Sequence, residues 1–136
     1  MTAATITVAE MVDRTGIDVY DYLDREAAVP TVDAAACQGD VSVLRVTTKA
    51  AVAPIPAAGY TVATGQGGHD HTLHGPGMFD PAPRRSGSLT VGTLTVPDGA
   101  EVFLSHPEHG GLLIAPGTYR VGTQREFAGE WRVVAD

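Results

Sequence analysis

From residue 39 onwards, short runs of β-forming residues alternate with turns that contain glycine or proline. Pro97-Asp98-Gly99 and Ala115-Pro116-Gly117 are the clearest turns, because proline presets φ and glycine accepts a positive φ. Turns at intervals of roughly 8–12 residues leave no room for long helices and predict a mainly β fold, a small antiparallel β-barrel or sandwich. The predicted strands are residues 40–48, 60–64, 69–73, 88–96, 101–105, 111–114, 118–125 and 131–134.

Residues 7–27 have a different pattern, in which apolar residues recur at helical spacing. Thr7 and Glu10 form a capping-box pair, in which each side chain satisfies a backbone N–H of the other residue. Gly16 suits the left-handed position at a helix end. We therefore expect two short helices, at about residues 8–14 and 17–27, with the second rich in aspartate.

The chain of 136 residues has the length of one domain, with 43% hydrophobic and 18% charged residues as in globular proteins. No apolar run approaches the ~18 residues that a membrane-spanning helix needs, and we expect no membrane partner. We expect residues 1–37 to form a helical N-terminal segment and linker, and residues 38–136 to form the β-barrel or sandwich domain.

The net charge of −7 is concentrated at the front of the chain, where residues 1–40 hold eight acidic and two basic residues. Such a surface repels phosphate backbones, which argues against nucleic-acid binding. A small-molecule ligand or a protein partner fits this surface better, and a homo-oligomer is compatible with it. The start of the chain has no signal-peptide pattern and Cys37 is the single cysteine, so a cytoplasmic location is expected.

All five histidines lie in two short runs, His69, His71 and His74 in the first and His106 and His109 in the second. Alternate residues of a strand share a face, so His69 and His71 are expected to reach one ion, with His74 on the opposite side. Because neutral imidazole is a common metal ligand, we predict a metal site built from His69, His71, His106 and His109. Zinc is the expected ion because it is common, with iron, manganese, nickel and copper as alternatives. Surface histidines in glycine-rich loops are the other interpretation.

Two further side chains are candidates for chemistry. Glu108, between the histidines of the second run, would act as a general base on a metal-bound water or as a further ligand. Its alternative role is that of a solvated turn residue. Arg125, which follows an alternating strand, would bind an anionic ligand. Its alternative role is a cross-strand ion pair with Glu126.

Several sequence runs resemble those of a small bacterial family with no established activity: Gln38-Gly39-Asp40-Val41, Gly68-His69-Asp70-His71, Ser105-His106-Pro107-Glu108-His109, Pro116-Gly117-Thr118-Tyr119-Arg120-Val121 and Gln124-Arg125-Glu126-Phe127. The resemblance covers about residues 38–136 and implies that the two histidine runs share one site. A glycine-rich approach to His69-x-His71, with a later histidine after Pro97-x-Gly99, is also similar to the cupin pattern. That likeness implies a double-stranded β-helix with a metal on His69, His71 and His106.

The sequence therefore supports two classes of function. The first is a small metal-binding β-domain protein, with metal-dependent hydrolysis or a cupin-like reaction as its enzymatic form. The second is a non-catalytic interaction or assembly module whose N-terminal helices dock a partner. Whether the protein is an enzyme stays open at this point.

Overall fold

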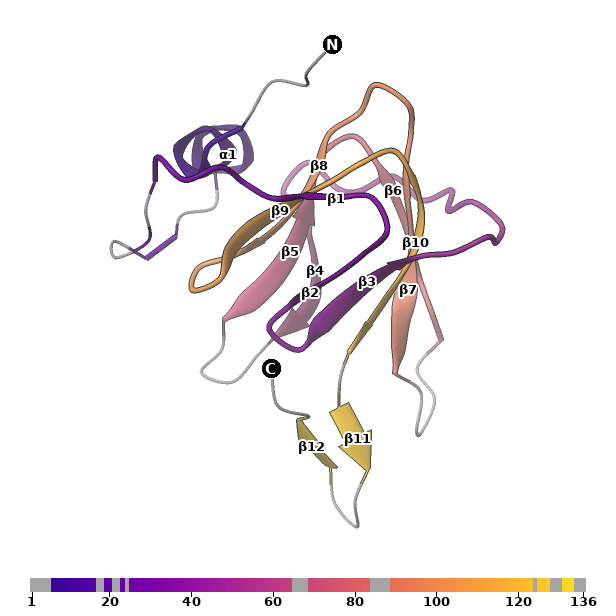
Figure 1. Cartoon of the computed structure of the whole chain (residues 1–136). Helices are drawn as coiled ribbons and strands as arrows, with labels where there is room; N and C mark the ends of the chain where they lie inside the picture. The colour runs from indigo at the N-terminus through magenta and orange to yellow at the C-terminus, as the bar shows by residue number, and fades with distance from the viewer. Residues whose placement is uncertain are drawn as a thin grey trace.

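The computed structural model describes residues 6–16, 19–20, 23, 25–64, 69–83, 89–123, 125–127 and 131–133. Two five-stranded sheets face each other as an open sandwich, and one short helix precedes them (Figure 1). The prediction of a mainly β fold is confirmed in its sandwich form.

The first sheet has the order β1-β9-β8-β5-β4 and the second the order β2-β3-β10-β7-β6. β1 pairs in parallel with β9, and the other pairings in these two sheets are antiparallel. A separate hairpin of β11 and β12 follows β10 and extends beyond the sandwich (Figure 1). The bounds are β1 Thr31–Val32, β2 Ala35–Gln38, β3 Val41–Arg45, β4 Tyr60–Thr64, β5 Asp70–His74, β6 Met78–Pro81, β7 Thr90–Val96, β8 Val102–His106, β9 Gly110–Ile114, β10 Gly117–Thr123, β11 Arg125–Phe127 and β12 Trp131–Val133.

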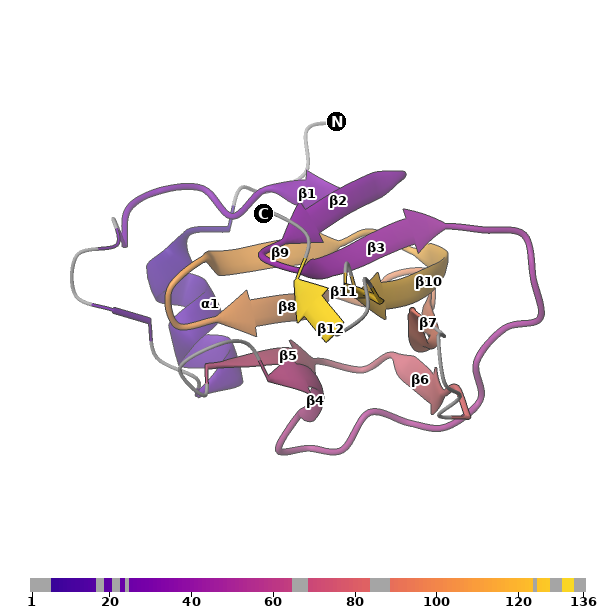
Figure 2. The ribbon, with the colours of Figure 1, turned by 90° about the horizontal axis from the view of Figure 1, so that it is seen from below.

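The main core lies between the two sheets (Figure 2). Alternate strand residues point inward, so Leu73 of β5, Leu104 of β8 and Leu94 of β7 belong to one buried cluster. Tyr119 of β10 is also fully buried there, and its hydroxyl donates to the carbonyl of Ala115 at 2.7 Å. Because the same alternation fixes which side chains face inward near the strand ends, it also determines where the histidines lie.

Helix α1 (Val8–Thr15) has the predicted capping box, and Gly16 ends it with φ 70°. The helix covers the outer face of β8 and β9 (Figure 2). Met11 is fully buried against Gly111, where an added Cβ would lie 2.0 Å from the Met11 sulfur. Phe103 belongs to the same buried cluster, so the apolar side of α1 packs on the protein's own sheet.

The prediction of a second helix at residues 17–27 is wrong for the part of that stretch that the structure describes, since residues 19–20, 23 and 25–27 are not helical. The chain there runs back along α1 instead. The backbone N–H groups of Val8 and Ala9 donate to the carbonyls of Ala27 and Arg25, each at 3.0 Å. These tertiary hydrogen bonds replace those that a second helix would have made.

Two stretches in which the sequence predicted no strand contain strands. The first, residues 28–38, contains β1 and β2, and the second, residues 75–87, contains β6. The small residues of β2 have little β propensity of their own, so pairing with β3 stabilises that strand. Among the described residues, no helix is long and apolar enough to cross a membrane.

Candidate functional site

Histidine rings from both sequence runs lie together at one end of the sandwich. The His71 and His106 ring centroids are 4.3 Å apart, and those of His106 and His109 are 4.5 Å apart. The His69 ring is 5.9 Å from that of His106. Because β5 pairs with β8, the two runs become neighbours although 35 positions separate His71 from His106. We call these four residues the histidine cluster.

His71 connects the two sheets. Its Nδ1 lies 2.9 Å from Oε1 of Gln38 on β2, and the Gln38 amide nitrogen donates to the carbonyl of Leu104 on β8 at 2.8 Å. Because the Gln38 nitrogen donates, its oxygen must accept, so the hydrogen of neutral His71 is on Nδ1. Nε2 then carries the lone pair, and it lies 3.6 Å from Oδ1 of Asp40. Both His71 and Asp40 are buried.

Gly39, in the turn between β2 and β3, lets the rings close over the backbone. An added Cβ at Gly39 would lie 2.9 Å from Nε2 of His109 and 3.2 Å from Cε1 of His71. The glycine also has φ 56°, in the left-handed region that favours glycine. A side chain at Gly39 would therefore push apart two rings of the histidine cluster.

His106 is held by the backbone of the turn that follows it. Its Nδ1 accepts from the N–H groups of Glu108 at 3.0 Å and His109 at 3.1 Å. Nδ1 is therefore unprotonated, and the neutral ring carries its hydrogen on Nε2. Burial lowers the pKa of His106 to about 4, and the neighbouring histidines, His71 first, add to this effect. His106 is thus neutral at pH 7.

The shifted pKa of His106 predicts that the metal-free protein loses stability in mild acid. The pKa is about 4 in the folded protein and 6.5 in the unfolded chain, so the unfolded chain binds more protons as the pH falls below about 6.5. Between pH 7 and pH 4.5 this favours unfolding by about 2 kcal/mol. Urea unfolding at the two pH values measures the effect. His106→Gln should reduce the pH dependence, whereas an unchanged dependence would contradict this assignment.

The outer rim of the site is formed by His69, Glu108 and Tyr20. Nδ1 of His69 lies 3.6 Å from Oε2 of Glu108, whose side chain is 50% exposed. The Tyr20 hydroxyl hydrogen-bonds Nε2 of His69, and the two rings meet edge to face with centroids 5.3 Å apart. The backbone N–H of Tyr20 also donates to the carbonyl of Pro107 at 2.8 Å.

The structure brings together His69, His71, His106 and His109, with Glu108 beside His69. Arg125 begins β11, but its side chain lies outside the described part of the structure. Sequence reasoning missed Gln38, Asp40 and Tyr20. The Gln38-Gly39-Asp40 turn was visible in the sequence, but nothing there indicated that it approaches the histidines.

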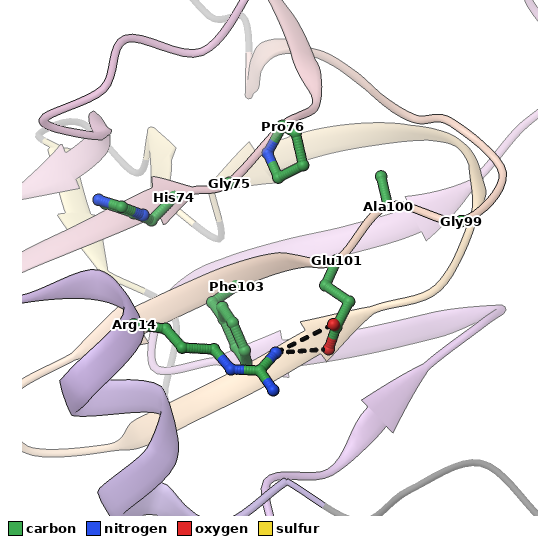
Figure 3. A pocket seen from close by; sticks show the side chains of 8 residues that line it. All are labelled: Arg14, His74, Gly75, Pro76, Gly99, Ala100, Glu101 and Phe103. Atoms are coloured by element: carbon green, nitrogen blue, oxygen red, sulfur yellow. Dashed lines mark hydrogen bonds and ion pairs between the residues drawn. The ribbon is translucent and has the colours of Figure 1, made fainter.

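His74 faces the other side of the first sheet. Together with Arg14, Glu101 and Phe103 it lines a pocket of about 330 Å³ beside α1 (Figure 3). One guanidinium nitrogen of Arg14 donates to both carboxylate oxygens of Glu101 at 2.9 Å (Figure 3). Because His74 and Phe103 point outward from their strands, this pocket is separate from the histidine cluster.

In their present orientations, no three His, Cys, Asp or Glu side chains of the described residues are arranged to hold a metal ion. The hydrogen bonds of His106 explain part of this arrangement. His106 directs Nδ1 at backbone amides, and the His106 ring lies within 4.5 Å of both His71 and His109 by centroid. Coordination would require at least one ring to turn.

Residues 37–124 match a domain of unknown function, DUF8820. The chain belongs to the DUF8820 family. The matched residues include the histidine cluster, Gln38, Asp40 and Glu108, whereas Tyr20 lies outside them. No curated protein and no solved structure matches the chain significantly. The DUF8820 match therefore gives the family without a reaction.

Proposed function

We propose that this DUF8820 protein binds a divalent transition-metal ion at the histidine cluster. The observation that carries the proposal is the orientation of His71. Histidines that bind metals generally donate the other ring N–H to a fixed carbonyl or carboxylate oxygen. His71 has this arrangement, because its Nδ1–H donates to Gln38 and Gln38 is itself held by the carbonyl of Leu104.

Asp40 supports the same conclusion. Its Oδ1 is 3.6 Å from Nε2 of His71, and two ligand atoms on one tetrahedral zinc ion are roughly 3.4 Å apart. A carboxylate oxygen and an imidazole lone pair repel each other at this separation unless a cation or a proton lies between them. A metal ion shared by His71 and Asp40 would place its positive charge between the two groups in a buried setting.

Further ligands would come from the exposed part of the cluster. His109 is exposed and lies over Gly39, so a turn of its ring would bring a nitrogen to the ion. Nε2 of His69, at the rim, could bind the ion if it gave up its hydrogen bond with the Tyr20 hydroxyl. Nδ1 of His106 would bind the ion only if the ring broke its hydrogen bonds with the backbone N–H groups of Glu108 and His109.

A ligand set of imidazole and carboxylate suits zinc, and also iron, manganese, nickel or copper. In a metal-dependent hydrolase, Glu108 would be the base acting on a metal-bound water. A cupin-like reaction is the other enzymatic form. Cupins take their glutamate from a position shortly after H-x-H, whereas residues 72–79 contain none. Asp40 lies beside His71 and Glu108 beside His69.

The test is metal binding by protein purified without a histidine tag and stripped with a chelator. Isothermal titration calorimetry with zinc should give one ion per chain, and elemental analysis after dialysis should retain it. Manganese, nickel and ferrous iron are titrated in parallel. If none of these ions binds at close to one per chain, the proposal is wrong.

Gln38→Leu should weaken zinc binding by about 10- to 100-fold, because the His71 ring loses the acceptor that fixes its orientation. Cys37→Ser is the matched control, since Cys37 is exposed and points away from the neighbouring buried Gln38. This control should bind zinc as the wild type does. Equal affinities for Gln38→Leu and Cys37→Ser would show that His71 is not held in this way.

A further inference from the structure

The pocket beside α1 lies outside the histidine cluster, and two neighbouring rings form its floor. His74 of β5 and Phe103 of β8 are direct partners in the antiparallel pairing, and both point outward from the sheet. Pro76 and Ala100 add apolar surface to the wall (Figure 3). With a volume of about 330 Å³, the pocket is at the small end of the range of ligand-binding pockets.

Three polar side chains border this floor. The side chains of Arg14 and Glu101 pair with each other, yet they are 46% and 47% exposed and so remain open to a solute. The Nε and Nη2 groups of Arg14 donate to no other described residue. The half-buried His74 ring has no hydrogen bond or ion pair with the described part of the chain, although neutral imidazole has one donor and one acceptor.

The backbone holds these groups in place. Gly75 follows His74 with φ 133°, and a Cβ added there would overlap the carbonyl oxygen of Glu101. The chain after β5 and the chain before β8 therefore meet at this glycine, which fixes the position of Glu101 relative to His74. Arg14 comes from α1, which is itself packed on the sheet through Met11. The pocket is thus formed before any ligand arrives.

We propose that this pocket binds a free α-amino acid with an apolar side chain. The opposite charges of Arg14 and Glu101 compensate each other, so a ligand with one charge would be attracted by one of them and repelled by the other. An α-amino acid carries an ammonium and a carboxylate group on the same carbon. Laid antiparallel on the pair, it places its carboxylate on the guanidinium and its ammonium on the Glu101 carboxylate.

The rest of the pocket suits the rest of such a ligand. Its apolar side chain would cover Phe103 and Pro76 and displace water from them. The His74 ring would donate to the carboxylate of the ligand or accept from its ammonium group. No metal ion takes part, so this inference goes beyond the proposed function and does not depend on it.

The probe is L-phenylalanine, compared with two analogues that each lack one of its charged groups. Phenethylamine keeps the ammonium without the carboxylate, and hydrocinnamate keeps the carboxylate without the ammonium. Isothermal titration calorimetry of the full-length, tag-free protein should show one phenylalanine bound per chain, with each analogue bound at least about tenfold more weakly. L-Leucine is titrated in parallel as an amino acid with an aliphatic side chain.

Arg14→Met should weaken phenylalanine binding by about tenfold or more, because the carboxylate of the ligand loses its charged donor. Arg120→Met is the matched control, since Arg120 is exposed on β10 in the other sheet. This control should bind phenylalanine as the wild type does. Far-ultraviolet circular dichroism verifies that both variants are folded.

Three results would overturn the inference. The first is that neither phenylalanine nor leucine binds at millimolar concentration. The second is that phenethylamine or hydrocinnamate binds as tightly as phenylalanine, since the pocket would then not recognise both charges. The third is that the two arginine variants bind phenylalanine equally well. Because these titrations contain no metal ion, each of these results leaves the proposed function unaffected.

Discussion

His71→Ala should abolish the rise in melting temperature that zinc produces in the wild-type protein. An ion that binds only the folded state at a concentration 100-fold above its Kd stabilises that state by about 2.7 kcal/mol. His71 supplies the ring whose Nε2 faces Asp40, so its removal takes away the best oriented ligand. Thermal unfolding with and without zinc measures the effect.

His74→Ala is the control on the same strand. His74 lines the pocket on the outer face of the sheet, so its loss should leave the zinc-dependent shift unchanged. His71→Ala also removes a buried side chain, and a lower melting temperature without metal is expected for that reason alone. The decisive quantity is therefore the shift on adding zinc. A wild-type shift in His71→Ala would exclude His71 as a ligand.

Met11→Ala should lower the free energy of unfolding by about 2–5 kcal/mol. Met11 is fully buried, and its sulfur fills the space above Gly111 in β9. Truncation leaves a cavity between α1 and the sheet that neighbouring side chains cannot fill completely. Urea unfolding measures the loss. Asp13→Ala, at an exposed position of the same helix, should change the stability by no more than about 0.5 kcal/mol.

Gly111→Ala tests the same contact from the sheet side. The added methyl group would overlap the Met11 sulfur, so this variant should be less stable than the wild type by about 1–3 kcal/mol. When Met11→Ala and Gly111→Ala are combined, the shorter side chain at position 11 makes room for the methyl group at position 111. The combined loss should then be smaller than the sum of the single losses by about 0.5–3 kcal/mol. Strict additivity would contradict direct packing of Met11 on Gly111.

Local sequence patterns predicted the elements whose stability is mainly local. The capping box of α1 and the strand at residues 60–64 agree with the structure, and Gly99 has the positive φ expected of its turn. β1, β2 and β6 were not predicted, because each is only two to four residues long, and β1 in addition pairs with a strand about 80 positions further along the chain. The expected helix at residues 17–27 was wrong in its described part because tertiary hydrogen bonds took precedence.

The site could be predicted only in part for the same reason. Strand alternation in the sequence predicts a common face for His69 and His71, whereas β5 begins at Asp70 and His69 precedes it. Their proximity to His106 depends on the pairing of β5 with β8. Gln38 and Asp40 arrive from the other sheet, and this depends on how the two sheets pack. No periodicity in the sequence encodes such a contact.

The packing of α1 also bears on the alternative hypothesis of an assembly module. That hypothesis needs an apolar helix face directed at a partner. Val8 and Met11 are buried, and they belong with Phe103 to a cluster within this chain. The apolar side of α1 is therefore already covered by its own sheet, and the exposed residues of the helix are Glu10, Asp13 and Arg14.

The parallel pairing of β1 with β9 extends the first sheet beyond the residues that match the family model. The family match begins at residue 37, after β1 and α1. The N–H groups of Leu113 and Ala115 donate to the carbonyls of Pro30 and Val32, both at 2.8 Å. A chain trimmed to the matched residues would expose an unpaired strand edge and the apolar surface beneath α1, two features that promote aggregation. Any transplanted or recombinant version of this domain should therefore carry the N-terminal segment with it.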